Sequence, residues 1–441
     1  MPAIPHRLIV LTDISSLTPG VREPDDGQSM VRLMLYSNEI EIEGLIASSN
    51  MRHGQTTRPE LIHSVVQAYG LAQPNLARHD SRYPAAANLA ARVRAGQPIA
   101  GPEIPVFSSI GPGRDTDGSD WIIERLRKPD PRPLWVSVWG GTADLAQALW
   151  RTRQSFPQGD ARSWMKRLRV HSIDDQDSTG VWLKAEFPEL FYISRYSSHR
   201  GMYRGGDRSL CSSEWVERHI KGHGPLGNLY PNYVGGDIFG RHGVNGIKEG
   251  DTPGYLGLIA NGLNPGADPA WGDWGGRCVP EDGNPYRWVD AVDPIPGYEQ
   301  DPLPPMATVY RWRPDFQADF QARLDWCLAS GDSPANHAPL ANIAGESHRV
   351  VHPEDTLRLD ASASADPDGR SLHFSWGIYS EAGTLSELNW FSSQDQPVFE
   401  FRIPPVDRPE TMHVLLTLAN DGDPVLKSYA RVVLDILPGR G

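Results

Sequence analysis

Residues 7–13, RLIVLTD, and residues 23–36, EPDDGQSMVRLMLY, decide the fold of this chain. Arg7 to Leu11 is a nearly continuous apolar run, which is typical of a strand that is buried in a sheet. A loop rich in Gly and Pro follows, and Gln28 to Tyr36 then has the pattern of a helix. This succession predicts a buried strand, a carboxylate-bearing loop and a helix that packs on the sheet.

Strand and helix patterns continue to alternate over about the first two hundred residues. The further predicted strands are residues 40–47, 134–138, 168–173 and 190–194, and the further predicted helices include residues 58–71 and 143–150. The alternation predicts an α/β fold with a mostly parallel sheet that is covered by helices. Residues 200–330 are rich in Gly, Pro and Trp, and we expect long loops with a few helices there.

A second pattern begins after a short linker-like segment, SGDSPANHAP, at residues 330–339. Residues 356–379, TLRLDASASADPDGRSLHFSWGIY, show strand alternation on both sides of an Asp-Pro-Asp-Gly turn. Closely spaced turns without a helix pattern predict a small all-β sandwich. We therefore expect an α/β domain at residues 1–332, a linker at 333–340 and a β-sandwich at 341–441.

The composition limits the partners that we expect. The 441 residues carry a formal net charge of −13, which argues against nucleic acid because phosphate neutralisation needs surplus Lys and Arg. Cys211, Cys278 and Cys327 are too few for a disulfide framework, and they form no zinc motif. We find no signal-peptide pattern and no apolar stretch of membrane-spanning length. We expect no membrane partner and a cytoplasmic location, with secretion or a periplasmic location left open.

Polar side chains follow the predicted strands at the points where they end. The carboxyl ends of the strands in an open α/β sheet form the edge where ligands bind. These strand-end segments are Thr12-Asp13 with the following Asp25-Asp26, Ser48-Ser49-Asn50, Trp139 to Asp144, and Asp174-Asp175-Gln176-Asp177. We expect them to converge on one edge of the sheet.

Asp13, Asp25 and Asp26 form the candidate metal centre. Carboxylates at a helix start also cap free N–H groups, which is an alternative explanation for Asp25 and for Asp26. It does not suit Asp13, because a carboxylate at the end of a buried strand needs a partner or a metal. Three crowded carboxylates repel one another, and a bound hard cation would compensate for that repulsion. Oxygen ligands indicate Ca²⁺ or Mg²⁺ rather than zinc.

At these residues the sequence resembles the inosine-uridine nucleoside hydrolases. The opening segments quoted above are similar to the aspartate-rich start of that family, and IEGLIASSN, VWGGTADLAQAL and KEGDTPGYLGLI are similar to three later segments. The resemblance implies Ca²⁺ as the metal and Asn50 as a sugar contact. It implies the following metal ligands: Asp13, Asp25, Asp26, Asp251 and a main-chain carbonyl near Ala143.

The resemblance is closer to the DUF1593 branch, whose members are also called cellulose-binding Sde182-like proteins. DDQDSTGVWLKAEFPELFYI, EGDTPGYLGLIANGL and WGDWGGR are similar to that branch over essentially the whole chain. It pairs a nucleoside-hydrolase-like domain with a C-terminal β-sandwich, and the C-terminal module here resembles immunoglobulin-like and PKD-like sandwiches. Such modules act as spacers, dimer contacts or carbohydrate-binding appendages, so we include a homo-oligomer among the expected assemblies.

Two differences from the inosine-uridine enzymes bear on function. Their first Asp lies close to the Asp-Asp pair, whereas Asp13 and Asp25 are twelve positions apart. They carry a His before the late Asp, where Gly250 stands here. We therefore expect a calcium-dependent glycoside-type hydrolase that cleaves an N- or O-glycosidic bond, in which Asp13 activates metal-bound water. The alternatives are a true nucleoside hydrolase and a non-catalytic carbohydrate-binding protein.

Further residues are candidates for contact with a carbohydrate or nucleoside-like small molecule. Carboxylates at the predicted fourth strand end and on the helix after it are candidates for an acid or a sugar contact, although turn and cap residues are equally common there. Trp139 offers an apolar ring for a sugar face. The candidate substrate contacts are Asp25, Asn50, Trp139, Asp174, Asp175, Asp177 and Glu186.

Overall fold

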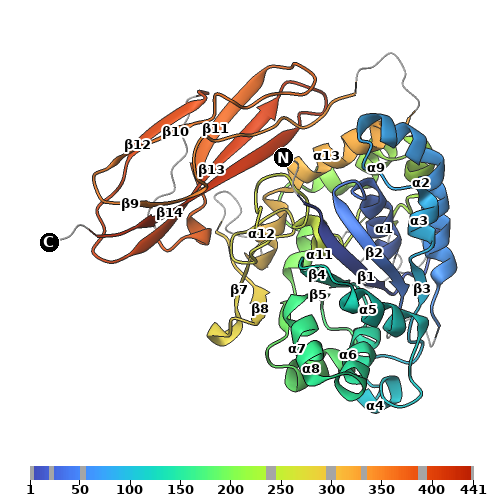
Figure 1. Cartoon of the computed structure of the whole chain (residues 1–441). Coiled ribbons are helices and arrows are strands. Elements are labelled where there is room, and N and C mark those ends of the chain that lie inside the picture. The colour runs from blue at the N-terminus through green and yellow to red at the C-terminus, as the bar shows by residue number, and fades with distance from the viewer. Residues whose placement is uncertain are drawn as a thin grey trace. The chain divides into compact units, whose positions relative to one another are not determined.

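The computed structural model describes residues 4–18, 24–49, 56–234, 245–294, 304–328, 335–385 and 395–438. It divides into two compact units (Figure 1). The first unit is Met1–Ile259 with Trp274–Arg313 and Arg323–Gly331, and the second is Ala260–Asp273 with Pro314–Ala322 and Asp332–Gly441.

The first unit is built on an eight-stranded sheet in the order β3-β2-β1-β4-β5-β6-β8-β7. Neighbouring strands pair in parallel except β7 with β8, which are antiparallel. The strands are β1 (His6–Thr12), β2 (Ile40–Ala47), β3 (Val93–Ala95), β4 (Leu134–Val138), β5 (Leu168–Ile173), β6 (Phe191–Arg195), β7 (Cys278–Pro280) and β8 (Arg287–Asp290). The predicted α/β fold with a mostly parallel sheet is confirmed.

Helices connect and cover these strands (Figure 1). The longer ones are α1 (Asp25–Leu35), α2 (Pro59–His79), α5 (Asp117–Arg127), α6 (Ala143–Ser155), α7 (Gln158–Arg167) and α8 (Ser178–Glu186). A further long helix, α13 (Arg313–Asp325), has most of its residues in the second unit. The shorter ones are α3 (Ala86–Ala90), α4 (Val106–Ser109), η1 (Ser198–Met202), η2 (Arg208–Cys211), α9 (Ser213–His219), α10 (Gly224–Leu229), α11 (Pro253–Leu256), η4 (Glu281–Gly283), η5 (Pro304–Met306) and α12 (Ala307–Tyr310). No helix in the described part of the chain has both the length and the apolar character needed to cross a bilayer.

The strand order places a topological switch point between β1 and β4. From β1 the chain proceeds to β2 and β3 on one side, and from β4 it proceeds to β5 and β6 on the other. Ile9 and Leu11 of β1 and Val136 of β4 are fully buried in one apolar cluster with residues of α5, α6 and α8. Because the loops after β1 and β4 lead in opposite directions, a ligand crevice is expected outside these strand ends.

The second unit is the predicted all-β domain. A four-stranded sheet, β11-β13-β14-β9, lies with a two-stranded sheet, β10-β12. Trp376 and Phe399 stack with ring centroids 5.5 Å apart in the shared core. The elements are β9 (His348–Val351), β10 (Thr356–Asp360), β11 (Leu372–Ile378), η6 (Ser380–Ala382), β12 (Val398–Arg402), β13 (Glu410–Asn420) and β14 (Lys427–Ile436).

Two segments that precede the predicted linker, 260–273 and 314–322, pack with the second unit. Asp315 accepts hydrogen bonds from Lys427 Nζ at 2.6 Å and from Tyr429 Oη at 2.5 Å. Arg431 Nε donates to the carbonyl of Leu263 at 2.7 Å. The strands of this unit therefore hold segments that are distant in the sequence.

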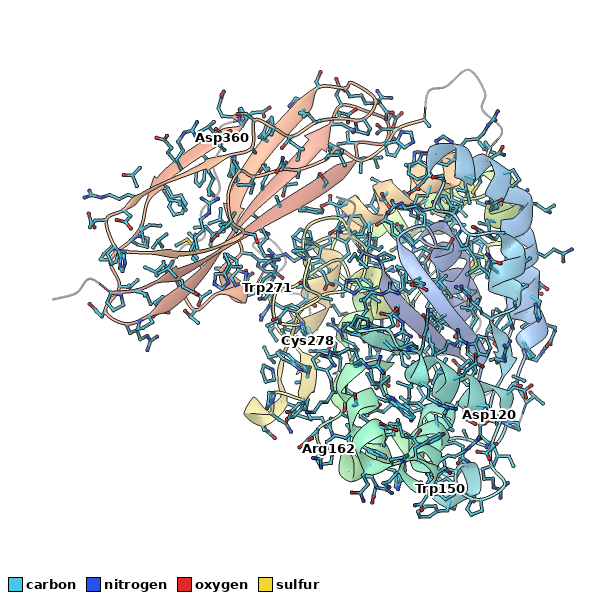
Figure 2. All side chains as sticks on the ribbon, viewed as in Figure 1. Asp120, Trp150, Arg162, Trp271, Cys278 and Asp360 are labelled. Atoms are coloured by element: carbon cyan, nitrogen blue, oxygen red, sulfur yellow. The ribbon has the colours of Figure 1, made fainter. Side chains whose placement is uncertain are left out.

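The three cysteines are buried free thiols. Figure 2 labels Cys278 on the short edge strand β7, together with Trp150 on α6 and Arg162 on α7. In the second unit it labels Asp360 at the end of β10 and Trp271, whose ring meets His413 edge to face at 5.3 Å.

Candidate metal centre

Asp25, Asp26 and Asp251 come together at the carboxyl edge of the sheet. Each offers a carboxylate oxygen, and these oxygens lie within 4.8 Å of one another. The helix α1 begins at Asp25, three residues before its predicted start, so both early aspartates lie in its first turn. Asp26 and Asp251 are buried, whereas Asp25 is partly exposed. The cluster thus combines a helix start with a loop more than two hundred residues away.

Hydrogen bonds from one glutamine hold that loop on α1. Gln28 Nε2 donates to the carbonyl of Gly246 at 2.9 Å. Its Oε1 accepts from the main-chain N–H groups of Lys248 at 2.8 Å and Glu249 at 3.1 Å. Gln28 is fully buried, so these bonds are shielded from water. Residues 246–249 are therefore positioned by a side chain two residues after Asp26.

A buried ion pair adds to this attachment. Arg32 Nε lies 2.5 Å from Glu249 Oε2, and both side chains are fully buried. Tyr230 donates its hydroxyl to Glu249 at 2.5 Å, and Thr252 donates to it at 3.0 Å. Glu249 also has a φ of 37°, in the left-handed region that non-glycine residues rarely adopt. The network fixes the backbone on both sides of Asp251.

Asp13 follows β1 and is only 8% exposed. It lies against Gly140, which follows β4: a Cβ on Gly140 would be 2.7 Å from the Cβ, Cγ and Oδ1 of Asp13. Asp13 is thus at the switch point between the two strands. Its charge also acts on Asp251, whose pKa it helps to raise.

Asp251 shows that the cluster is electrostatically unbalanced. Burial raises the pKa of its carboxyl well above the usual value, and the charges of Asp26, Asp25 and Asp13 raise it further. Its Oδ2 is buried and has no hydrogen-bond partner among the described residues. A buried carboxylate oxygen without a partner is costly. A divalent cation with oxygen ligands would supply that partner, so the residues fit Ca²⁺ or Mg²⁺.

A lysine that the sequence analysis did not single out also belongs to this site. Lys248 Nζ lies 3.0 Å from Asp25 Oδ2, and the Lys248 side chain is 4% exposed. The cluster therefore contains one internal cation. Thr12 at the end of β1 donates its hydroxyl to Asp26, which orients that carboxylate. Lys248 begins the segment KEGDTPGYLGLI, but nothing in the sequence assigned it a role of its own.

Asp177 and Asp175 have structural partners. Asp177 caps α8 by accepting from the Thr179 N–H at 2.9 Å, and it also accepts from the Ala143 N–H at 3.1 Å and Thr142 Oγ1 at 3.0 Å. Asp175 accepts from Tyr192 Oη at 2.5 Å and pairs with Lys184 at 2.6 Å. Asp177 thus has the capping role that the sequence analysis weighed against substrate contact, whereas Asp175 connects β6 with α8.

The other predicted substrate contacts are dispersed. Asp174 is 43% exposed and lies 3.4 Å from Arg200, and Glu186 is 43% exposed and pairs with Arg153 at 2.9 Å. Trp139 is fully buried, and its ring lies 6.1 Å from that of Tyr255, so its faces belong to the core.

Two predicted residues remain. Ala143 is the first residue of α6, and its N–H is bonded to Asp177. Asn50 lies outside the described residues.

His199 is a second residue that the sequence analysis did not identify. It lies in η1, directly after β6, and is 6% exposed. Burial lowers its pKa to about 3, and the nearby charge of Arg200 contributes to the shift. Only the fold brings it to the metal centre, because no motif surrounds it in the sequence.

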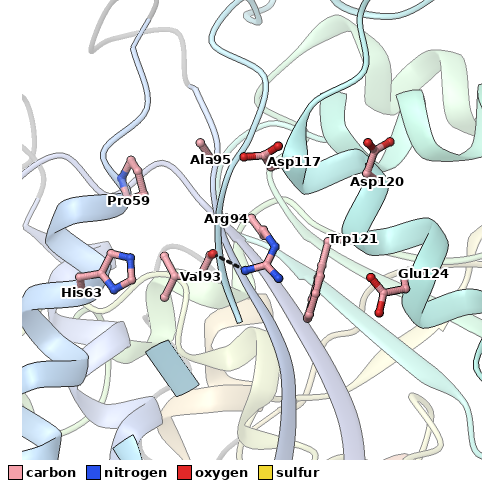
Figure 3. A pocket seen from close by; sticks show the side chains of 9 residues that line it. All are labelled: Pro59, His63, Val93, Arg94, Ala95, Asp117, Asp120, Trp121 and Glu124. Atoms are coloured by element: carbon pink, nitrogen blue, oxygen red, sulfur yellow. Dashed lines mark hydrogen bonds between the residues drawn. The ribbon is translucent and has the colours of Figure 1, made fainter. Parts of the chain in front are cut away.

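A separate open groove of about 610 Å³ lies over the edge strand β3, between α2 and α5 (Figure 3). Arg94 lies over the ring of Trp121, with its Cζ 3.6 Å from the ring centroid. The Arg125 guanidinium lies 4.4 Å from the same centroid, so two arginine side chains contact the Trp121 ring. The groove shares no residue with the metal centre.

The sheet order and the aspartates at its switch point define an α/β protein of the nucleoside hydrolase-like class. The family described as "Cellulose-binding Sde182, nucleoside hydrolase-like domain" matches residues 7–278. The family "Cellulose-binding protein Sde0182, C-terminal domain" matches residues 356–436. The chain belongs to this cellulose-binding Sde182 family, as the resemblance implied.

A solved structure supports the same conclusion over the full length. It is described as a nucleoside hydrolase-related hypothetical protein from Saccharophagus degradans that is associated with carbohydrate metabolism. It is 31% identical, with a TM-score of 0.80, and the match covers 98% of this chain and 100% of that one. A comparison with curated proteins found no match.

Two further structural matches are too weak to indicate a fold or a function. One is a structure of carbohydrate-binding modules from the β-sandwich superfamily, with 18% identity, a TM-score of 0.19, and coverage of 24% of this chain and 38% of that one. The other is a β-glucuronidase from Bacteroides uniformis, with 11% identity, a TM-score of 0.17, and coverage of 99% and 46%.

Proposed function

We propose that this protein is a calcium-dependent hydrolase that cleaves an N- or O-glycosidic bond of a sugar substrate. The observation that carries the proposal is the cluster of Asp25, Asp26 and Asp251, in which Asp251 Oδ2 is buried without a hydrogen-bond partner among the described residues. A cluster of carboxylates that is buried in this way needs a cation to balance its charge. The family's nucleoside hydrolase-like fold supports hydrolysis as the chemistry.

Asp25, Asp26 and Asp251 would hold the ion, and Asp13 lies beside them. When bound, Ca²⁺ supplies Lewis-acid activation of water and a grip on sugar hydroxyls. The oxygen-only ligands favour Ca²⁺ or Mg²⁺ over softer metals. We choose Ca²⁺ because Asp25 is partly exposed and the ligands come from two separate segments, which suits the more flexible coordination of calcium.

The side chains have distinct tasks in this hydrolysis. The oxygen of water forms the new bond to the anomeric carbon, and the bond from that carbon to the leaving atom breaks with its electron pair on the leaving atom. Asp13 accepts the proton that the water loses. The remaining carboxylates favour the positive charge that develops on the sugar in the oxocarbenium-like transition state. Gly140 leaves room for the Asp13 carboxylate at the strand end.

The substrate class is proposed from the relatives. The family is described as cellulose-binding, and the Saccharophagus degradans protein as associated with carbohydrate metabolism. These descriptions support a carbohydrate rather than a nucleoside. Nucleoside hydrolysis and carbohydrate binding without turnover remain outcomes of the test.

The test uses the full chain after removal of metal by a chelator, with and without added Ca²⁺. Substrates are the 4-nitrophenyl glycosides of β-D-ribofuranose, α-L-arabinofuranose, β-D-glucopyranose and β-D-cellobiose, together with inosine and uridine. We expect calcium-dependent release of nitrophenol. Release of free base from inosine or uridine would instead identify a nucleoside hydrolase. Binding of cello-oligosaccharides without any hydrolysis would identify a carbohydrate-binding protein.

A pair of variants connects the activity with the cluster. Asp26→Asn keeps the side-chain shape and removes one ligand charge, so we expect loss of both calcium response and turnover. Asp160→Asn is the matched control, since Asp160 also lies in the first turn of a helix, α7, but is exposed. Full activity of Asp26→Asn would contradict the proposed centre.

A further inference from the structure

The ring of His199 lies beside the aspartate cluster, across the space that Gly250 leaves open. A Cβ on Gly250 would be 3.6 Å from His199 Cδ2 and 3.6 Å from Asp25 Oδ2. The distance between His199 Cδ2 and Asp25 Oδ2 is therefore at most twice 3.6 Å. Cδ2 is thus the ring atom nearest to residue 250, and Nε2 is bonded directly to it.

The short helix that carries His199 is firmly anchored. Asp290 Oδ2 accepts from the N–H groups of Ser197 at 2.7 Å and Ser198 at 3.1 Å. Arg195 Nη1 donates to Ser198 Oγ at 3.1 Å and lies 3.7 Å from Asp290 Oδ1. The main chain next to His199 is thus held in place before any ligand arrives, and a group that recognises a transition state needs such a fixed support.

The surroundings of His199 determine where its proton lies. Its Nδ1 is buried and has no hydrogen-bond partner among the described residues. Burial and the nearby charges of Arg200, Lys248 and Arg195 favour the neutral ring, and they outweigh the opposing charge of Asp290. A neutral imidazole carries one N–H, and a buried N–H without an acceptor is costly. The tautomer with the hydrogen on Nε2 is therefore favoured, which leaves Nε2 as the donor of the ring.

The charges around the site bear on bond heterolysis. The carboxylates of Asp13, Asp25, Asp26 and Asp251 favour a positive anomeric carbon. Arg200, Arg195 and Lys248, the last of which also pairs with Asp25, act on the His199 ring and favour a negative leaving atom, and the Asp290 carboxylate opposes them in part. A breaking glycosidic bond develops both charges at once.

We propose that His199 is a catalytic residue of the proposed hydrolase, whose Nε2–H donates a hydrogen bond to the leaving atom of the glycoside. This inference rests on the proposed function and names a further residue of the same site. As the bond from the anomeric carbon breaks, its electron pair passes to the leaving atom, and the hydrogen bond stabilises that charge. Water supplies the new oxygen, Asp13 takes the water proton, and the released group is protonated by solvent according to its own pKa.

The test measures how turnover depends on the leaving group. Phenyl, 4-nitrophenyl and 2,4-dinitrophenyl glycosides of the fastest sugar in the panel above are compared with wild type, His199→Phe and His199→Gln. Phe fills the ring volume without a donor, whereas the amide of Gln places an N–H near the position of Nε2. The calcium-induced rise in melting temperature is recorded for each variant, to show that the fold and metal site are retained.

We expect His199→Phe to lose about 10²-fold in kcat/KM on the phenyl glycoside, within the range for removal of one preorganised hydrogen-bond donor, and only a few-fold on the dinitrophenyl glycoside. His199→Gln should recover part of the loss on the phenyl glycoside. An equal loss across the series, or no loss, would overturn the role of His199 while leaving the proposed function intact. No turnover of any glycoside or nucleoside by the wild-type protein would overturn the proposed function and this inference with it.

Discussion

Gly140 and Asp13 lie so close at the ends of β4 and β1 that a methyl group on Gly140 would be 2.7 Å from three atoms of Asp13. The glycine is needed there for space rather than for an unusual φ. Any side chain at residue 140 has to displace the Asp13 carboxylate from the switch point. The contact therefore links an apparently featureless residue to the proposed catalytic base.

We expect Gly140→Ala to reduce turnover at least tenfold and to cost about 1–3 kcal/mol of stability, as overpacking of a tight site does. The measurements are kcat/KM on the best glycoside and the free energy of unfolding in urea. Gly159→Ala is the matched control, because nothing lies within 4 Å of a Cβ at that exposed helical position. That control should gain up to about 1 kcal/mol. Unchanged turnover in Gly140→Ala would separate Asp13 from catalysis.

Asp251 predicts how stability depends on pH. Its pKa in the metal-free folded protein is raised well above the usual value of 3.8. The folded state therefore binds this proton more tightly than the unfolded state, and the resulting stability is present below pH 3.8 and lost as pH rises through the raised pKa. Calcium requires the ionised carboxylate, so its stabilising effect should grow with pH over the same window.

The measurement is the melting temperature at pH 5, 6, 7 and 8 with chelator or with Ca²⁺. Binding at about 100 times Kd contributes roughly 2.7 kcal/mol, which corresponds to several degrees. In Asp251→Asn, we expect the metal-free protein to be at least as stable as wild type at pH 8 and the calcium shift to disappear. A calcium shift of the same size at pH 5 and 8 in wild type would contradict the role of Asp251.

Lys248 predicts a limit on calcium affinity. Its ammonium lies 3.0 Å from Asp25 Oδ2, so it shares a carboxylate with the proposed metal and repels the cation. Two unit charges near a protein surface interact by roughly 1–4 kcal/mol at 4 Å. We expect Lys248→Met to bind Ca²⁺ about tenfold more tightly, which corresponds to roughly 1.4 kcal/mol.

Calorimetric titration of the metal-free protein measures this change. Lys166→Met, at an exposed position of α7, makes the same change in net charge away from the site and should leave the affinity unaltered. Weaker binding by Lys248→Met would show that the lysine is needed to orient Asp25.

The buried pair of Arg32 and Glu249 predicts a large stability effect. Arg32→Met leaves the Glu249 carboxylate buried with its charge unpaired, so we expect a loss of about 3–5 kcal/mol. The double variant with Glu249→Gln should recover part of it. Arg153→Met removes a pair of which both members are more than 40% exposed, and it should cost less than about 1 kcal/mol. Urea unfolding measures all three, and equal losses for the two single variants would contradict the argument.

The sequence by itself determined the α/β fold and the position of the first aspartates. Apolar runs such as Ile9 to Leu11 and the helical pattern after Asp26 are local signals, because each segment has to bury its own apolar side chains. A carboxylate at the end of a buried strand also signals a need for a partner, which is why Asp13 could be identified from its position alone.

The tertiary structure decided which polar residues share the site. Asp174, Asp175 and Asp177 look alike in the sequence, yet hydrogen bonds with distant residues make Asp177 a helix cap and Asp175 a partner of Lys184. No pattern in the sequence assigned a role to Lys248 or His199, and they lie near Asp25 only because α1, the loop before α11 and η1 pack at the same edge of the sheet. Such proximity depends on long-range packing, which no local pattern in the sequence encodes.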